Sequence, residues 1–206
     1  MVKDVFAGIC AGISQVIVGH PLDTIKVHVQ NKYPLPKIRL LYKGYHYPLI
    51  YAITYNSLIF PIISHSTLPK YQSGFLSGII VTPLAFFFDL CKVKRQTRQS
   101  IGIHLLWHRG FTMAFLRETI AMSAYFSSYY ELKTHINPLY AGGLAGLINW
   151  TITYPLDVIR NRQFVQNCKI KEAIKQKKFW GGYSFCALRA ILVNTAIFAT
   201  YEFVKE

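Results

Sequence analysis

The chain has 206 residues, of which 52% are hydrophobic and 15% aromatic, and its formal net charge at pH 7 is +14. Four uncharged stretches are each near the roughly 20 residues that a membrane-spanning helix needs: 5–22, 44–69, 71–88 and 136–156. A soluble helical protein rarely buries so many apolar runs, so the composition indicates an all-α membrane protein.

The first predicted helix spans about 4–31 and contains Gly8-x3-Gly12 and then Pro21. Glycines four residues apart let helix backbones approach closely inside a bilayer. An internal proline is expected to kink the helix, because it removes a backbone donor and clashes with the preceding turn. The second predicted helix, 46–66, is uncharged and follows a basic loop.

The next two predicted helices span about 71–99 and 110–133, and the last two span 138–165 and 183–204. Pro155 should kink the fifth helix as Pro21 does the first. A mean hydropathy of +0.25 is low for six helices bathed in lipid, but it fits helices that line a polar cavity. The even helices accordingly carry isolated charges: Arg117, Glu118 and Arg189.

One pattern occurs three times along the chain, with aspartates spaced 66 and 68 residues apart: Asp23, Asp89 and Asp157. Each is followed three residues later by a base, namely Lys26, Lys92 and Arg160. Because such periods mark structural repeats, we expect six transmembrane helices in three two-helix units around a pseudo-threefold axis. The units, 1–68, 69–136 and 137–206, would form one membrane domain.

Most of the positive charge lies in the loops within the repeats. Of 23 lysines and arginines, 16 fall in 31–45, 90–110 and 160–178. The positive-inside rule places these loops on one side of the membrane and both termini on the other. Topology then accounts for the charge, which argues against nucleic-acid binding. No signal peptide is expected, because Lys3-Asp4 leads directly into the first helix.

The repeated acid and base share one helix face, since they are three residues apart. Threefold symmetry would bring six charges to one depth, where the acid of one helix can pair with the base of another. The alternative is three solvated surface pairs, each worth about 0–1 kcal/mol. A ring of pairs that water can reach could serve as a gate, because it opens without leaving charge stranded in lipid.

Two segments share a longer motif, Pro21-Leu-Asp-Thr-Ile-Lys-Val-His28 and Pro155-Leu-Asp-Val-Ile-Arg-Asn-Arg162, and the middle copy has Phe87 in place of the proline. This motif resembles the mitochondrial carrier signature Pro-x-[Asp/Glu]-x-x-[Lys/Arg]-x-[Lys/Arg]. An aromatic–basic–glycine element before each even helix is also similar to that family. The resemblance implies a transporter of the mitochondrial inner membrane that exchanges a small metabolite by alternating access, with the basic loops facing the matrix.

The resemblance also implies residue roles. A matrix-side gate would pair Asp23 with Lys92, Asp89 with Arg160 and Asp157 with Lys26. Gln30 and Gln96 match the glutamines that brace this gate, and Phe164 stands at the third such position. The opposite gate matches the family pattern at four residues: Tyr201, Glu202, Lys205 and Lys133. Its second copy lacks the acid in register, and its first copy has no charge pair.

Four positions match the family's mid-membrane substrate contacts: Tyr51, Arg117, Glu118 and Arg189. Ionisable groups deep in a membrane usually mark a site. The alternatives are that Arg117 and Glu118 neutralise each other and that Arg189 snorkels. The adjacent Arg and Glu resemble carriers of amino acids and carnitine-like zwitterions. A nucleotide or deoxynucleotide exchanger and a degenerate carrier acting as a membrane scaffold stay open as alternatives.

The chain is short for this family, and only the third repeat leaves room for a surface helix, within 169–178. The seven histidines and four cysteines show no catalytic or ligand grouping, so no enzyme activity, cofactor or metal is expected. The expected partners are a small-molecule substrate and membrane lipids such as cardiolipin, but not nucleic acid. The carrier is expected to be a monomer.

Overall fold

The computed structural model describes residues 2–51, 54, 68–100 and 109–205. Its elements are α1 (Val2–Gln30), the 3-10 turn η1 (Ile38–Leu40), α3 (Lys70–Gln96), α4 (Phe111–Leu132), α5 (Pro138–Gln166), α6 (Ile170–Lys175) and α7 (Tyr183–Lys205). Residues 46–51 are also helical. The described part of the chain contains no strand, which confirms the prediction of an all-helical protein.

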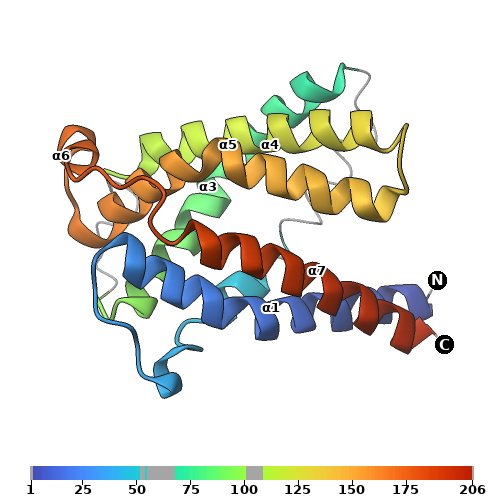
Figure 1. The fold of residues 1–206 in the computed structure, drawn as a ribbon, viewed down its shortest axis with the longest axis horizontal. Coiled ribbons are helices and arrows are strands. Elements are labelled where there is room, and N and C mark those ends of the chain that lie inside the picture. The colour runs from blue at the N-terminus through green and yellow to red at the C-terminus, as the bar shows by residue number, and fades with distance from the viewer. Residues whose placement is uncertain (1, 52–53, 55–67, 101–108, 206) are drawn as a thin grey trace.

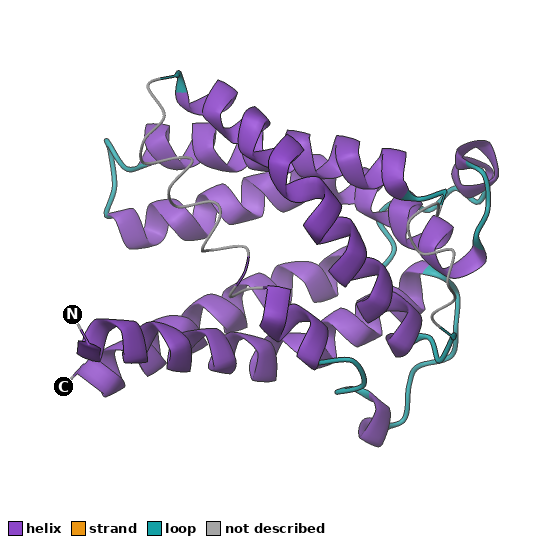
Figure 2. Ribbon diagram, turned by 180° about the vertical axis from the view of Figure 1, so that it is seen from behind, coloured by secondary structure: helices purple, strands orange, loops and turns teal. Residues whose placement is uncertain are grey.

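The first and last helices of the chain lie side by side. α1 and α7 run antiparallel, and both termini lie at the same end of the molecule (Figure 1). α4 packs against both α3 and α5. At the end opposite the termini, α6 lies beside the loops that connect the long helices (Figure 2). The first and last helices of the chain therefore pack against each other, although they are far apart in the sequence.

The three long odd helices end in the same way, with a left-handed residue just beyond the last turn: Lys32 (φ 57°), Arg98 (φ 60°) and Asn167 (φ 48°). After α3, the Gln99 N–H bonds back to the carbonyl of Lys94 at 2.8 Å, which satisfies a carbonyl that the helix end leaves free. The helix ends at Gln96, three residues before the predicted end at about residue 99, because the turn at Arg98 reverses the chain earlier.

The Gly-x3-Gly pair of α3 brings its backbone against α4. A Cβ on Gly74 would lie 2.6 Å from the Met122 carbonyl oxygen, and one on Gly78 would lie 2.7 Å from Thr119 Cα. This is the close backbone approach that glycines four residues apart allow. Among the described residues, nothing lies within 4 Å of the corresponding point on Gly12 or Gly146.

Hydropathy singles out one of the six predicted spans. Within the described residues, Tyr71–Gln96 is long and apolar enough to cross a membrane, and Tyr183–Val193 is a shorter apolar segment. The other long helices mix apolar residues with polar ones that point inward; on α5, for example, Thr153 and Asp157 are fully buried. Such residues lower the mean hydropathy of a helix without being exposed at its outer surface.

The short helix predicted within 169–178 is present as α6. The second base of the third motif holds it in place: the buried Arg162 guanidinium donates to the carbonyls of Ala173 at 3.0 Å and Lys177 at 2.7 Å. A single α5 side chain therefore satisfies backbone acceptors at the end of the α6 segment.

Candidate functional site

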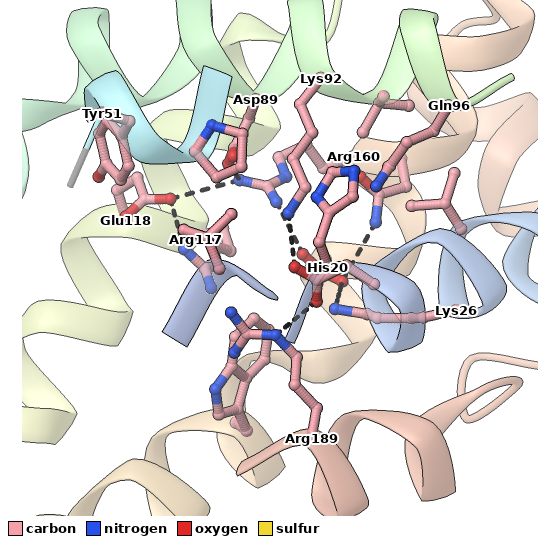
Figure 3. A pocket seen from close by; sticks show the side chains of 18 of the residues that line it. His20, Lys26, Tyr51, Asp89, Lys92, Gln96, Arg117, Glu118, Arg160 and Arg189 are labelled. Carbon is pink, nitrogen blue, oxygen red and sulfur yellow. Dashed lines mark hydrogen bonds and ion pairs between the residues drawn. The ribbon is translucent and has the colours of Figure 1, made fainter. Parts of the chain in front are cut away.

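A cavity of about 300 Å³ lies between the helices and is lined by charged side chains (Figure 3). Its lining contains five bases and four carboxylates: Lys26, Lys92, Arg117, Arg160, Arg189, Asp23, Asp89, Glu118 and Asp157. These give the lining a formal net charge of +1, with histidine counted as neutral. Buried charges are costly unless they are paired, so their contacts decide what the cavity can do.

Three ion pairs join the odd helices in a ring. Lys92 Nζ lies 2.6 Å from Asp23 Oδ2, which joins α3 to α1. Arg160 Nη1 lies 2.8 Å from Asp89 Oδ2, which joins α5 to α3. Lys26 Nζ lies 2.7 Å from Asp157 Oδ2, which joins α1 to α5. The partners are the ones that the family resemblance implied, and we call these six residues the ion-pair ring.

The carboxylates of the ion-pair ring differ in their surroundings. The Asp157 side chain is 1% exposed and also lies 2.8 Å from Arg160 Nη2, and it accepts amide hydrogen bonds from Gln30 and Asn161, each at 3.2 Å. The Asp89 side chain is 26% exposed and is paired, within the described residues, with Arg160. The ring is therefore most firmly held at Asp157.

The two glutamines predicted as braces lie in different environments. Gln30 donates to Asp157 and to the Tyr154 hydroxyl at 3.2 Å, and its carbonyl oxygen accepts from Asn161 at 2.6 Å. Gln96 instead donates to the Thr24 hydroxyl at 3.0 Å. At the third position, Phe164 is buried, and its ring centroid lies 5.5 Å from the Arg160 guanidinium carbon.

The predicted substrate contacts all line the cavity. Glu118 is buried and pairs with Arg117, as the charge-neutralisation alternative expected, and it also lies 3.3 Å from Arg160 Nη1. Arg189 does not snorkel, because its Nε lies 2.7 Å from Asp23 Oδ1. Tyr51 packs against Phe88, with 6.0 Å between ring centroids. Two of the even-helix charges, Glu118 and Arg189, therefore contact the ion-pair ring directly.

Sequence reasoning missed an aromatic residue and an amide in the cavity. Trp150 lies two turns before Asp157 on the same face of α5, and its ring is 4.3 Å from Lys26 Nζ and 4.9 Å from the Arg117 guanidinium carbon. Asn161, one turn after Asp157, contacts both Asp157 and Gln30. The helical spacing to Asp157 was the signal that could have found them.

Only part of the predicted opposite gate lies within the described residues. The side chains of Tyr201, Glu202 and Lys205 lie outside the described residues. Lys133 is exposed, and its Nζ lies 4.0 Å from the Tyr130 ring centroid. Glu131 is also exposed and contacts His135, in the turn that follows α4, at 3.7 Å. No ion pair between helices is seen here among the described residues.

A family model described as mitochondrial carrier protein matches residues 1–39 and 133–206, more than half of the chain. The chain belongs to the mitochondrial carrier family. The unmatched part includes the middle motif, where Phe87 replaces the proline. Membership makes the chain a transport protein of the mitochondrial inner membrane, and the members of this family are transporters rather than enzymes.

Curated relatives align along almost the whole carrier. It is 26% identical over 270 positions to the "Mitochondrial arginine transporter BAC2" of Arabidopsis thaliana, covering 97% of this chain and 89% of the relative. It is 27% identical over 272 positions to the "Mitochondrial basic amino acids transporter" of Homo sapiens, covering 99% and 90%. It is 25% identical over 281 positions to "Solute carrier family 25 member 45" of Mus musculus, covering 98% and 98%. Because these alignments exceed the 206 residues of the chain, this carrier is shortened internally.

Proposed function

We propose that this carrier exchanges a small metabolite, an amino acid or a carnitine-like zwitterion, by alternating access between two gates. The observation that carries the proposal is the cavity, in which Arg117, Glu118 and Arg189 approach the ion-pair ring from the even helices. The names of two relatives, an arginine transporter and a basic amino acids transporter, support an amino acid as cargo.

The charges of the cavity support a ligand that carries both signs. Every carboxylate in the lining already contacts a base, and the lining has only one more base than acids. A nucleotide triphosphate would need several unpaired cations, since each buried anion requires charge-assisted partners. A carboxylate and an ammonium group can instead exchange partners with the pairs that are present. The three ion pairs also favour a working gate over a purely scaffolding role.

The ion-pair ring serves, in this proposal, as the matrix-side gate. Each of the repeats 1–68, 69–136 and 137–206 contributes one carboxylate and one base, and the basic loops place the ring toward the matrix. Bends at Pro21 and Pro155, two residues before Asp23 and Asp157, turn the ends of the odd helices inward toward this gate. The opposite gate is formed by four residues: Tyr201, Glu202, Lys205 and Lys133. Tighter binding of substrate in the occluded state supplies the free energy for the change between states.

Uptake into liposomes tests this function. Purified carrier in liposomes preloaded with lysine should take up labelled arginine or lysine, and Arg117→Ala should lower the rate by about tenfold or more, because a charge-assisted contact of roughly 1.5–3 kcal/mol is lost. Lys171→Ala, at an exposed residue of α6 outside the cavity, is the matched control and should keep the wild-type rate.

Failure of the wild-type carrier to move any amino acid or carnitine would contradict the proposed cargo. Normal uptake by a correctly inserted Arg117→Ala carrier would show that the substrate is bound elsewhere. Because both variants are compared at equal amounts of protein in the membrane, a folding defect is separated from a binding defect.

A further inference from the structure

Two ion pairs connect the ion-pair ring to the even helices (Figure 3). Arg189 of α7 contacts Asp23, and Glu118 of α4 contacts Arg160; we call these two contacts the first and the second tie. We propose that these two contacts hold the ring closed in the empty carrier, and that a ligand opens it by occupying Arg189 and Glu118 at the same time. The inference rests on the proposed function and narrows its substrate to molecules that carry a carboxylate and a cationic group together.

The first tie joins α7 to α1. Asp23 uses its two oxygens for two bases, with Oδ2 2.6 Å from Lys92 Nζ and Oδ1 2.7 Å from Arg189 Nε. Gly19 makes room for this arrangement, because a Cβ there would lie 3.1 Å from Arg189 Nε and 2.9 Å from Val193. A residue placed in the substrate site thus neutralises one carboxylate of the ring.

The second tie joins α4 to α5. The Glu118 side chain is only 5% exposed, and its Oε1 accepts from both Arg117 and Arg160. The same Arg160 nitrogen also donates to Asp89 at 2.8 Å, so Glu118 and Asp89 share one donor. A residue in the substrate site therefore also helps to neutralise a base of the ring.

Both ties have poorer hydrogen-bond geometry than two of the three pairs of the ring. The Lys92 and Arg160 pairs are aligned hydrogen bonds of 2.6 and 2.8 Å. The tie from Arg160 to Glu118 is longer, at 3.3 Å. The buried Nε–H of Arg189 has no aligned hydrogen-bond acceptor within the described residues, so its contact with Asp23 is a charge contact without direction. Contacts of this kind are the ones that a ligand can replace with better geometry.

A ligand with one charged group can replace only one tie. A carboxylate can take Arg189 in a bidentate contact, but Glu118 then still holds Arg160. A cation can take Glu118, but Arg189 then still holds Asp23. The carboxylate and one cationic group of an amino acid or another zwitterion of suitable length can replace both contacts at the same time. The two ties therefore select for ligands of mixed charge.

The rate at which a thiol reagent labels a cysteine on the far side of the ion-pair ring measures how often the ring opens. Val16 lines the cavity, is 8% exposed and lies two turns before Asp23 on α1, on the side of the ring that faces the termini. We would introduce Val16→Cys into a carrier whose own cysteines, Cys10, Cys91, Cys168 and Cys186, are replaced by alanine. A membrane-impermeant thiol reagent is applied from the side of the basic loops, with lysine, cadaverine or hexanoate as ligand.

Lysine should raise the labelling rate by about fivefold or more, whereas cadaverine or hexanoate alone should leave it near the basal rate. In Arg189→Gln the tie to Asp23 is absent, so cadaverine alone should now suffice. In Glu118→Gln the ionic tie to Arg160 is absent, so hexanoate alone should suffice. Lys171→Gln, outside the cavity, should behave as the parent carrier does.

Opening of the parent carrier by cadaverine or by hexanoate alone would overturn the inference, as would an unchanged ligand requirement in both variants. The Arg189→Gln and Glu118→Gln double variant separates this outcome from failure of the proposed function. If it is labelled faster than the parent carrier without any ligand, the ties hold the ring closed even if lysine has no effect. If its basal labelling equals that of the parent, the ties are refuted whatever the carrier transports.

Discussion

Replacing Asp157 should destabilise the carrier far more than replacing Asp89. The Asp157 carboxylate is 1% exposed and contacts two buried bases, Lys26 and Arg160, at 2.7 and 2.8 Å. Asp157→Asn leaves these bases without that countercharge, which costs about 3–5 kcal/mol for a buried pair. Asp89 is 26% exposed, and its partner Arg160 keeps Asp157 and Glu118 in Asp89→Asn, so the cost there is about 1 kcal/mol.

Thermal unfolding of the purified carrier in detergent measures the difference. At about 2–4 °C per kcal/mol for a chain of this size, Asp157→Asn should lower Tm by roughly 6–20 °C and Asp89→Asn by roughly 2–4 °C. The two substitutions change the same number of atoms and charges, so each is the control of the other. Equal shifts, or a larger shift for Asp89→Asn, would refute the reasoning that burial and partner number rank the ring carboxylates.

Two further predictions concern the packing around the site. Gly78→Ala should lower the free energy of unfolding by about 1–3 kcal/mol, because the added Cβ would lie 2.7 Å from Thr119 Cα. Gly146→Ala, where nothing lies within 4 Å of the added Cβ among the described residues, should be neutral or stabilising. A thermal melt that ranks the two variants the other way contradicts the close contact between α3 and α4. Arg162→Ala should cost roughly 2–4 kcal/mol, because it strands the carbonyls of Ala173 and Lys177. Faster proteolysis of the segment 167–182, which contains α6, checks this expectation, and cleavage at the wild-type rate would exclude the anchoring role.

The helices and the depth of the ion-pair ring could be predicted because the chain repeats one motif, whereas the pairing partners came from the resemblance to the mitochondrial carrier family. A base three residues after each acid fixes the helix face, and the recurrence of Asp23, Asp89 and Asp157 fixes the depth. Helix ends were less predictable. They depend on which residue takes the left-handed turn, and here residues such as Arg98 do so without the glycine that would have signalled it.

The contacts between even and odd helices could not be predicted, since they depend on tilts and rotations that no sequence spacing records. Arg189 and Glu118 were expected in the cavity, but their contacts with Asp23 and Arg160 follow from the way in which α7 packs on α1 and α4 packs on α5. For the same reason Gln96, which occupies the motif position equivalent to Gln30, donates to Thr24 and not to a ring carboxylate.

The middle repeat indicates what the missing proline does not do. Phe87 stands in its place, and Pro83 lies one turn earlier within a helix that continues from Lys70 to Gln96. Asp89 nevertheless reaches Arg160 at 2.8 Å, close to the 2.7 Å between Lys26 and Asp157. A proline at position 87 is therefore not required for the carboxylate to join the ring. The middle repeat differs instead in the surroundings of its carboxylate, because Asp89 is more exposed than Asp157 and has fewer partners.

These surroundings make the α3–α5 side of the ring the one that resists separation least. Movement of α3 there is coupled to α4, because the backbones of the two helices are in close contact at Gly74 and Gly78. α4 carries Glu118, and Glu118 contacts Arg160 of α5 across the same side. Separation at this side therefore breaks the contacts of Arg160 with Asp89 and with Glu118 together. In the proposed opening, a cationic ligand group competes for the contact with Glu118, so the ligand would act on the side of the ring that holds its most exposed carboxylate, Asp89.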